Sequence, residues 1–523
     1  MQGQRGQQVT EPDTSEIGIA VSDVYASAFP ELAVPWEAGE PERPALLVLN
    51  DEVVRDVSLD PRWLRSESGV RALLGNELAE GARPVAQAYA GHQFGNYSAR
   101  LGDGRALLLG ERTNALGELR DLHLKGSGPT PFARSDGYAA IGPMLREYVL
   151  GEAMHALGIR STRALAVIDT GRRVRRDAEL LPGAVLVRVA RSHLRVGTFQ
   201  YARSMRDEEL LSRLVAHALE RHYPERQGDD TPALALLDGV IEAQAQLVAD
   251  WMLVGFIHGV MNTDNVSIAG ETIDYGPCAF MDAFEPTTVF SSIDHNGRYS
   301  YGNQPGITQW NLARFAEALL PLLDGDETRA IEIAEDRIGR FAALYESAWL
   351  RGMRAKLGIS GGAGSPVDST IGSGAAMHRD TELAQTILQD LRDHSLDYTG
   401  FFRALAEAAR GDETAIRAFY VGSADAGSDQ RGEAGADVWP RPWTEAWRSL
   451  GPDADAMDRV NPVYVPRNHL VEEALDAATA GDLAPLTRLV EVLRAPFDAR
   501  PDRARFALPA PAGSWIGTTF CGT

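Results

Sequence analysis

The segment FIHGVMNTDNVSIAGETIDYGP, residues 256–277, is the part of the chain that decides the predicted fold. If Ala269-Gly270 forms a two-residue turn, the flanking stretches pair as strands and Asn265 faces Asp274. Directly opposed residues have Cβ atoms about 4.5–5.5 Å apart, so an amide oxygen and a carboxylate would converge on one point. Magnesium prefers such oxygen ligands and shares substrate phosphates. The segment therefore predicts a divalent-metal site; the alternative is that Asn265 caps a turn and Asp274 is a solvated strand end.

The neighbours of this pair favour the metal site. Phosphotransferases of the aminoglycoside and choline kinase type carry a pattern that resembles HGDxxxxN, followed by a metal-binding Asp in a DFG-like position. Here HG stands at 258–259, Asn265 matches the metal-binding Asn, and DYG at 274–276 places Asp274 as the second metal ligand.

One position departs from that pattern. Val260 stands where such a kinase has the Asp that accepts the proton of the substrate hydroxyl. A valine cannot accept a proton. Either the protein binds nucleotide without turnover, or another group is the base, and Asp264 beside the metal ligand is the candidate.

Apolar alternation upstream predicts a small antiparallel sheet and one helix. RALLLGE (105–111) and LRDLHLKGSG (119–128) are typical of two strands bounded by glycines, and AVLVRV (184–189) begins another. Apolar residues at helical spacing predict a helix over 143–158. After residue 205 the pattern is mostly helical, with a long apolar helix over 240–259.

This order predicts an α+β chain with a protein-kinase-like two-lobed fold. A small antiparallel sheet plus one helix precedes a larger, mostly helical lobe, and extensions flank both. About the first 15 residues are expected to be disordered, and 30–82 to form short helices and loops. The predicted units are an N-terminal extension (1–84), an N-lobe (85–200), a C-lobe (201–435) with a Gly/Ser-rich insertion near 359–377, and a C-terminal helical extension with a cysteine-containing tail (436–523).

Composition excludes several classes of protein. The 523 residues carry a net charge of −22, so counterion release would disfavour nucleic-acid binding. No run approaches the roughly 20 apolar residues that a membrane span needs, and no signal sequence is expected, so we predict a cytoplasmic protein. The chain has only two cysteines, which is too few for a framework of several disulfides.

Several residues in the predicted sheet and helix could contact phosphates. Closely spaced Gly102 and Gly104 would let backbone N–H groups approach phosphate oxygens, although most such turns only join strands. Lys125 on a strand and Glu147 on the next helix have the arrangement of a kinase Lys–Glu pair; the alternative is a surface salt bridge. Fixed cations with planar donors suited to phosphate are Arg105, Arg188 and Arg195.

These stretches resemble the selenoprotein O (YdiU) family of protein adenylyltransferases, from about residue 85 to the end. The stretches that carry the resemblance are YAGHQFGNYSARLGDGRALLLGE, LHLKGSGPTPFARSDG, MLREYVLGEAMHALGI, VRVARSHLRVGTFQ, GVMNTDNVSIAGETIDYGP, NQPGITQWNL and NPVYVPRNHLVEEAL. Seven ordered blocks are highly specific.

The resemblance implies a pseudokinase in which ATP binds in a flipped orientation, so that AMP is joined to Ser, Thr or Tyr of a protein and pyrophosphate leaves. Asp264 would be the proton acceptor, and Asn265 and Asp274 would hold Mg²⁺ or Mn²⁺. The loop PFARSDGYAA departs from the family's usual pattern. The implied nucleotide contacts are Gly102, Gly104, Arg105, Lys125, Asp136, Gly137, Arg188, Arg195 and Asp274, with Glu147 holding Lys125.

The two cysteines form a possible redox pair. Cys278 follows Asp274 by four residues, and Cys521 is third from the carboxyl end, where members of that family often keep a cysteine or selenocysteine. A disulfide there would close or distort the site; the alternative is that Cys278 is a small buried hydrophobe. Three functions stay open at this point: AMP transfer to protein, phosphotransfer to a protein or small molecule, and nucleotide binding without turnover.

Overall fold

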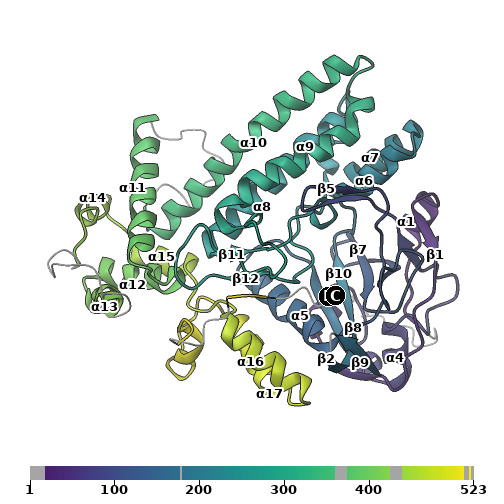
Figure 1. Cartoon of the computed structure of the whole chain (residues 1–523), viewed down its shortest axis with the longest axis horizontal. Helices are drawn as coiled ribbons and strands as arrows, with labels where there is room; N and C mark the ends of the chain where they lie inside the picture. The colour runs from purple at the N-terminus through teal and green to yellow at the C-terminus, as the bar shows by residue number, and fades with distance from the viewer. Residues whose placement is uncertain (1–17, 177–178, 360–373, 425–438, 512–516, 520–523) are drawn as a thin grey trace, which may run out of the picture.

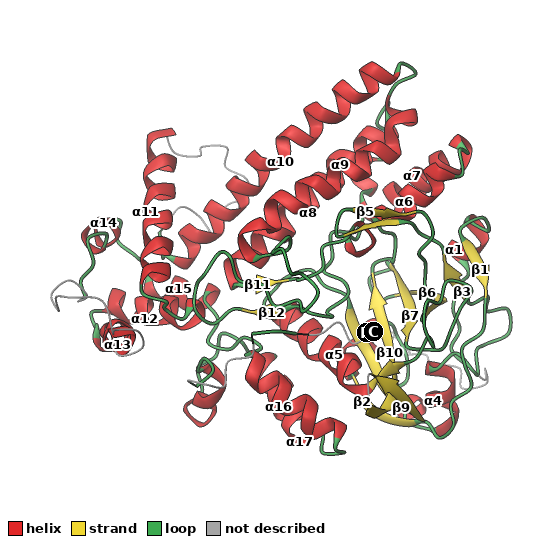
Figure 2. Ribbon diagram, in the orientation of Figure 1, coloured by secondary structure: helices red, strands yellow, loops and turns green. Residues whose placement is uncertain are grey.

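The computed structural model describes residues 18–176, 179–359, 374–424, 439–511 and 517–519. An antiparallel sheet lies at one side of the molecule and most helices lie at the other (Figure 2). The α+β class predicted from the sequence is confirmed. No helix among these residues is both long and apolar enough to cross a bilayer.

The main sheet has the strand order β1-β3-β6-β7-β10-β9-β2, and β8 pairs with β10. Two strand pairs stand apart from it, β4 with β5 and β11 with β12. The strands are β1 (Ala33–Pro35), β2 (Ala45–Leu49), β3 (Val85–Gln87), β4 (Gly91–Gln93), β5 (Asn96–Ser98), β6 (Ala106–Thr113), β7 (Leu119–Lys125), β8 (Ala139–Ala140), β9 (Arg163–Arg176), β10 (Glu179–Ala190), β11 (Phe256–Ile257) and β12 (Ala279–Phe280).

The helices are α1 (Val24–Ala28), α2 (Asp51–Asp56), α3 (Pro61–Leu64), α4 (Glu67–Leu73), α5 (Ile141–Ala156), α6 (Val196–Ser204), α7 (Glu208–His222), α8 (Pro232–Val254), α9 (Gln304–Leu323), α10 (Glu327–Lys356), α11 (Gly374–Asp393), α12 (Tyr398–Arg410), α13 (Thr414–Ala424), α14 (Thr444–Ser449), α15 (Ala454–Val460), α16 (Asn468–Thr479) and α17 (Ala484–Leu493). Short 3-10 turns are η1 (Pro224–Arg226), η2 (Thr263–Asn265), η3 (Tyr301–Asn303) and η4 (Pro501–Ala507).

The two faces of the sheet differ because side chains alternate along each strand. On β7, Leu122 and Leu124 belong to an apolar core that also contains Val53 and Leu73 from α2 and α4. Lys125, on the alternate set of positions, contacts α5 on the opposite face. The predicted strands at 105–111 and 119–128 are thus present as β6 and β7.

Helix α5 lies between the sheet and the C-terminal helices α16 and α17 (Figure 1). Arg146 donates to Glu472 of α16 at 2.6 Å, and Arg494, directly after α17, donates to Glu152 at 2.8 Å. The helix predicted over 143–158 is confirmed, and Gly158, at φ +79°, follows its end. The C-terminal extension therefore supports the helix that carries Glu147.

Helices α8, α9 and α10 run side by side and form the centre of the helical part (Figure 1). The apolar helix expected over 240–259 begins earlier, at Pro232, and ends at Val254. Gly255 stops it in the left-handed conformation, which glycine adopts without steric cost. The chain then enters β11 and reaches η2, beside the sheet.

The hairpin predicted within 256–277 is wrong. Gly270 N–H donates to Ser267 at 3.2 Å, so the turn lies one residue earlier than expected. Ser267 forms a bridge with Arg195, and Thr272 forms one with Ser161, so the two stretches pair with other segments and not with each other. Asn265 belongs to η2 and is no strand residue. Tertiary partners outcompeted a local turn that the sequence alone made plausible.

Two further differences concern the sheet. Residues 30–82, expected as short helices and loops, also supply β1 and β2, the edge strands of the sheet. The strand β9 was not predicted, because basic residues fill its second half and mask the alternation. The Gly/Ser-rich insertion near 359–377 lies largely outside the described residues, as does the N-terminal stretch expected to be disordered.

Candidate active site

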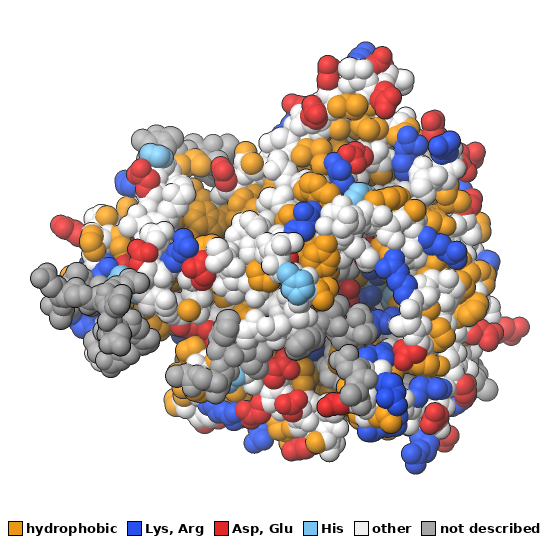
Figure 3. Space-filling model, in the orientation of Figure 1, with side chains coloured by type: hydrophobic (Ala, Val, Ile, Leu, Met, Phe, Trp, Pro, Cys, Tyr) orange, Lys and Arg blue, Asp and Glu red, His pale blue; other side chains and the backbone are white. Residues whose placement is uncertain are grey.

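A cavity of about 460 Å³ lies between the sheet and η2. Five cationic side chains and three carboxylates line it, a charge density that fits a small polyanion with a metal ion. The charged residues are Arg105, Lys125, Arg134, Arg188, Arg195, Asp103, Asp264 and Asp274. On the face drawn in Figure 3, Lys and Arg side chains lie along the hollow beside the sheet.

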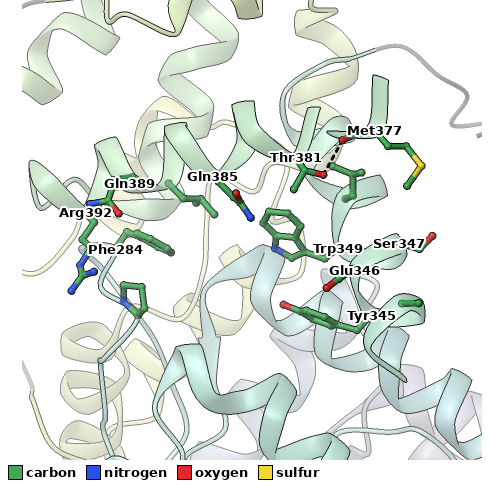
Figure 4. A pocket seen from close by; sticks show the side chains of 14 residues that line it. Phe284, Tyr345, Glu346, Ser347, Trp349, Met377, Thr381, Gln385, Gln389 and Arg392 are labelled. Atoms are coloured by element: carbon green, nitrogen blue, oxygen red, sulfur yellow. Dashed lines mark hydrogen bonds between the residues drawn. The ribbon is translucent and has the colours of Figure 1, made fainter. Parts of the chain in front are cut away.

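Two larger cavities, each of about 740 Å³, are lined by fewer charged side chains. One lies between α10 and α11, where Phe284, Tyr345 and Trp349 line it with one acid and one base, Glu346 and Arg392 (Figure 4). Volume alone would select one of these two cavities. The convergence of charged groups selects the smaller one beside the sheet.

Lys125 joins the strand β7 to two acidic side chains. Its ammonium forms ion pairs with Glu147 of α5 and with Asp274. Only 8% of the Lys125 side chain and 4% of the Glu147 side chain are exposed, so this is no surface salt bridge. Arg188 NH1 lies 3.6 Å from the other oxygen of Glu147. Glu147 thus holds two cations at the cavity wall.

Asp274 has an uncommon backbone conformation, with φ at +72°. Such a conformation is strained for a residue with a side chain and often occurs at functional sites. Burial raises the pKa of Asp274, but Lys125, Arg188 and Arg195 outweigh burial and hold the pKa below its usual value. The group is therefore an anion at neutral pH, as a metal ligand must be.

Asp264 is a buried carboxylate in η2 with an unused oxygen. Its Oδ2 accepts a long hydrogen bond of 3.4 Å from Gln93, whereas Oδ1 has no partner among the described residues. Burial raises the pKa of Asp264 to about 6, against the lowering effect of Arg195. Gly91 makes room, since a Cβ there would lie 2.8 Å from Oδ1. The arrangement suits a general base.

Asn265 is hydrogen-bonded to Val260, the residue at the position where a kinase has its catalytic Asp. Its Nδ2 donates to the Val260 carbonyl at 3.1 Å, which leaves Oδ1 as the acceptor end of the amide. Asn265 does not line the cavity itself. Among the described residues, no group of three or more His, Cys, Asp or Glu side chains is arranged to hold a metal ion. An amide oxygen and a carboxylate are ligand types that Mg²⁺ accepts, although Asn265 lines a separate small cavity with Trp251 and His258.

The Gly-rich turn packs against the loop after Lys125. A Cβ at Gly102 would lie 2.5 Å from the Phe132 ring, and one at Gly104 would lie 2.9 Å from the Phe132 carbonyl oxygen. The N–H groups of Asp103 and Gly104 already donate within the protein, to Gln87 and Gly102. The glycines therefore serve close packing, and the side chains around them provide most of the cationic surface.

Asp136 and Gly137 lie apart from the other predicted residues. The Asp136 carboxylate pairs with Arg176 at 3.1 Å, and neither Asp136 nor Gly137 lines the cavity. Their neighbours Arg134 and Ser135 do line it. Apart from Asn265, the structure brings the other predicted metal, base and nucleotide residues together: Gly102, Gly104, Arg105, Lys125, Arg188, Arg195, Asp264 and Asp274 line the cavity, and Glu147 braces it.

Sequence reasoning missed Asp103, Tyr89 and Gln93, which also line the cavity. Asp103 stands between the two glycines that were singled out, and it is 1% exposed. An acid inside a turn proposed to bind phosphates was the available signal. Arg195 stacks 4.6 Å over the Tyr89 ring, a contact that no sequence pattern indicates.

Of the two cysteines, Cys278 is described and Cys521 lies outside the described residues. Cys278 is fully buried, and burial raises the pKa of its thiol to about 12. The tail does reach this region, because Thr519 donates to the Pro277 carbonyl through its hydroxyl and to Phe290 through its N–H at 2.7 Å.

The chain matches known proteins over nearly its whole length. The family model described as "Protein adenylyltransferase SelO" matches residues 21–494. The chain belongs to the SelO family. Curated relatives, each described as "Protein nucleotidyltransferase YdiU", include one from Mycobacterium sp. (strain KMS), 57% identical over 500 residues, which are 95% of this chain and 98% of the relative. A second, from Pseudarthrobacter chlorophenolicus, is 56% identical over 510 residues, or 97% and 99% of the two chains.

A third relative, from Cereibacter sphaeroides, is 52% identical over 503 residues, or 95% of this chain and 98% of the relative. Membership of the SelO family confirms the predicted resemblance and the prediction of a nucleotidyl-transferring enzyme. The family match begins at residue 21, so it also covers residues 21–84 of the predicted N-terminal extension (1–84).

Proposed function

We propose that this SelO family member transfers AMP from ATP to Ser, Thr or Tyr hydroxyls of proteins. The observation that carries the proposal is Asp264, a buried carboxylate with a free oxygen in the same cavity as Lys125, Arg188 and Arg195. Phosphate-binding cations and a base with a pKa near neutrality are the parts that hydroxyl attack on a phosphoanhydride needs.

In this mechanism the hydroxyl oxygen forms a bond to the α-phosphorus. The bond from that phosphorus to the bridging oxygen of the β-phosphate breaks, and pyrophosphate leaves. Asp264 takes the hydroxyl proton, and Lys125, Arg188 and Arg195 stabilise charge on the departing pyrophosphate. ATP would lie flipped relative to an ordinary kinase, so that its α-phosphate faces Asp264.

Asp274 and Asn265 would hold Mg²⁺ or Mn²⁺. When bound, the ion neutralises phosphate charge and makes the α-phosphorus more electrophilic. Lys125 pairs with both Asp274 and Glu147. It would contact a phosphate while Glu147 keeps its ammonium in place.

The same geometry supports a protein-kinase-like two-lobed fold. The sheet with α5 would be the N-lobe and the helices from α6 onward the C-lobe, with the nucleotide between them. The Lys125–Glu147 pair between strand and helix supports this reading. Val260 argues against phosphotransfer, because the kinase base is absent from that position.

The first experiment compares [α-³²P]ATP with [γ-³²P]ATP, using the purified protein, a protein extract as acceptor, magnesium or manganese, and a reductant. Label on protein from the α-phosphate alone, lost in Asp274→Ala and in EDTA, is expected. Label from the γ-phosphate alone would show a kinase with a different base. Nucleotide binding without either label would show a binding protein.

A disulfide between Cys278 and Cys521 stays a prediction. The docking of Thr519 on Pro277 supports it, because the tail passes next to the loop that carries Cys278. The high pKa of the Cys278 thiol opposes rapid exchange while the loop is packed. Activity of Cys521→Ala should no longer depend on reductant; an unchanged redox response would remove the switch.

A further inference from the structure

Beyond Lys125, the same face of the sheet continues as a row of buried polar side chains. Asp121 and His123 precede Lys125 on β7 at two-residue spacing, so all three point to one face. Asp121 is 2% exposed and His123 is 0% exposed. Arg188 lies directly opposite His123 on β10 and lines the cavity. Burying polar side chains costs free energy unless each of them is paired. A buried row of this kind therefore suggests a functional role.

Two histidines contact the guanidinium of Arg188. Its Nε donates to His193 Nε2 at 3.2 Å, and its NH2 lies 3.5 Å from His123 Nδ1. The two imidazole rings stack with centroids 4.0 Å apart and planes 16° apart. A guanidinium can only donate, so both of these ring nitrogens must be acceptors.

A carboxylate sets the tautomer of each ring. Asp103 Oδ2 lies 3.0 Å from His123 Nε2, and Asp121 Oδ2 lies 2.9 Å from His193 Nδ1. The nitrogen that faces a carboxylate carries the proton, which leaves His123 Nδ1 and His193 Nε2 free to accept from Arg188. Burial lowers the pKa of both histidines, so the rings are neutral at physiological pH.

The carboxylates are themselves anchored. Asp103 Oδ2 accepts the Gln87 N–H at 3.0 Å, and Asp121 accepts the His193 N–H at 2.8 Å and pairs with Arg221 of α7. The network is thus tied to the sheet at one end and to the helical part at the other.

One nitrogen of Arg188 is left over. NH1 is buried and has no hydrogen-bond partner in the described part of the chain; Glu147 Oε2, at 3.6 Å, is too far for a good hydrogen bond. Of the other two nitrogens, Nε donates to His193 at 3.2 Å, and NH2 makes a long contact of 3.5 Å with His123. The guanidinium is therefore held short of a full pair with Glu147, with NH1 available to a ligand.

We infer that the pairs Asp103–His123 and Asp121–His193 are positioning residues that orient Arg188 so that NH1 meets a phosphate oxygen of a bound polyphosphate. The choice of ATP as that polyphosphate rests on the proposed function. The orientation of Arg188 does not, and inorganic pyrophosphate is a sufficient probe. Without the histidine acceptors, the guanidinium would rotate toward Glu147 and lose its contact with phosphate.

The test is a double-mutant cycle on the affinity for pyrophosphate with Mg²⁺, measured by calorimetry at pH 7.5. His193→Met removes the acceptor and should weaken binding about tenfold, the effect of one charge-assisted hydrogen bond. His193→Gln places an oxygen near Nε2 and should stay within about threefold of wild type. In an Arg188→Met background, His193→Met should have no further effect.

The matched control is His222→Met. His222 is 5% exposed, and among the described residues its one hydrogen-bond partner is Ser192 at 2.7 Å, beside the network but not on Arg188. It should leave pyrophosphate affinity unchanged. Equal losses for His193→Met in the wild-type and Arg188→Met backgrounds, or no loss at all, would overturn the inference.

A measurement on the wild-type chain covers the case in which the variants do not fold. Imidazole ¹⁵N shifts should show the Nε2–H tautomer for His123 and the Nδ1–H tautomer for His193, both neutral at pH 7. The opposite tautomer of either histidine, or a protonated ring, would contradict the proposed orientation of Arg188. The labelling assay measures AMP transfer separately. The proposed orientation of Arg188 and the proposed AMP transfer can therefore be disproved independently of each other.

Discussion

At the scale of single residues, the base role of Asp264 can be tested by a substitution of nearly equal size. Asparagine has the shape of aspartate, but its amide cannot take up a proton. We predict that Asp264→Asn lowers the rate of AMP transfer at saturating ATP by at least about 10²-fold, the usual contribution of a general base. ATP affinity should change little, because the cations that bind the phosphates remain. Single-turnover kinetics and calorimetry measure the two effects.

The control for this substitution is Asp250→Asn, a partly buried carboxylate of α8 that does not line the cavity. It should behave as wild type. If Asp264→Asn kept full activity, the base would have to be another group.

A second residue-scale feature lies far from the cavity. Lys356, at the end of α10, is 4% exposed; its ammonium donates to Asn461 at 2.8 Å and lies 4.1 Å from the centre of the Phe402 ring. Burial lowers its pKa from 10.5 to about 7. Burial is the one cause of this shift, with no offsetting charge from the described residues.

This pKa predicts how stability depends on pH. Between about pH 7 and 10.5 the unfolded chain holds a proton on Lys356 that the folded chain lacks, so the free energy of unfolding rises with pH in that window. Lys356→Met removes the contribution. We expect the wild-type free energy of unfolding, minus that of the variant, to rise by up to about 1.4 kcal/mol per pH unit. Urea titrations from pH 7.5 to 9.5 measure it; parallel curves would contradict it.

At the scale of elements, the sequence was most informative where local pattern and tertiary environment agree. The strands β6 and β7 and the helix α5 have one clear apolar face each, and all three were predicted within a few residues. Lys125 of β7 accordingly lies at the cavity and is held by Glu147 of α5, because β7 and α5 face each other. This strand–helix pair could be predicted without knowing the rest of the fold.

The remainder depended on contacts between distant segments. The turn at 267–270 was misplaced because Ser267 and Thr272 bridge to Arg195 and Ser161, which lie far away in sequence. The pairing of Asp121 with His193 and of Asp103 with His123 depends on the register of β7 against β10 and on the loop after it. Alternation of Asp121, His123 and Lys125 with leucines was visible, but it is also the pattern of a half-exposed strand.

Arg467, directly before α16, supports a prediction at this scale. It is 0% exposed, donates to Asp282 at 2.7 Å and to Asp397 at 2.6 Å, and also reaches the Ala507 carbonyl at 2.8 Å. Arg467→Met would leave two mostly buried carboxylates without their cation. We expect a loss of about 3–5 kcal/mol in the free energy of unfolding, measured by urea denaturation.

The control for Arg467 is the same substitution in an exposed ion-pair group. Arg410→Met removes pairs with Asp455 and Asp458 at the surface and should cost only a small fraction of that free energy. Equal costs at the two positions would show that burial is not what makes Arg467 important.

At the scale of the whole molecule, the N-terminal residues belong to the main sheet. They provide the edge strands β1 and β2, and α2 and α4 cover one apolar face with Val53, Val54 and Leu73. We predict that a chain of residues 85–523 aggregates, because β9 becomes an open edge and that face meets water. Size-exclusion chromatography and dye binding to exposed apolar surface measure this.

A chain that begins at Gly18 is the matched control, since it keeps every described element, and its melting temperature should equal that of the full chain. Monomeric, cooperatively melting 85–523 would instead support the predicted boundary at residue 84.

Helix α5 is held against the C-terminal helices, and this limits how the enzyme can be controlled. Arg146 and Glu152 tie this helix to α16 and to the end of α17, while Glu147 on the same helix holds Lys125. A kinase whose helix is free to swing can populate an inactive conformer by moving that Glu away from its Lys. Here such a conformer would require the C-terminal helices to detach as well. The resting ensemble should therefore be dominated by one conformer with the Lys–Glu pair formed, and any effector would have to work by occupying the cavity or by altering the tail.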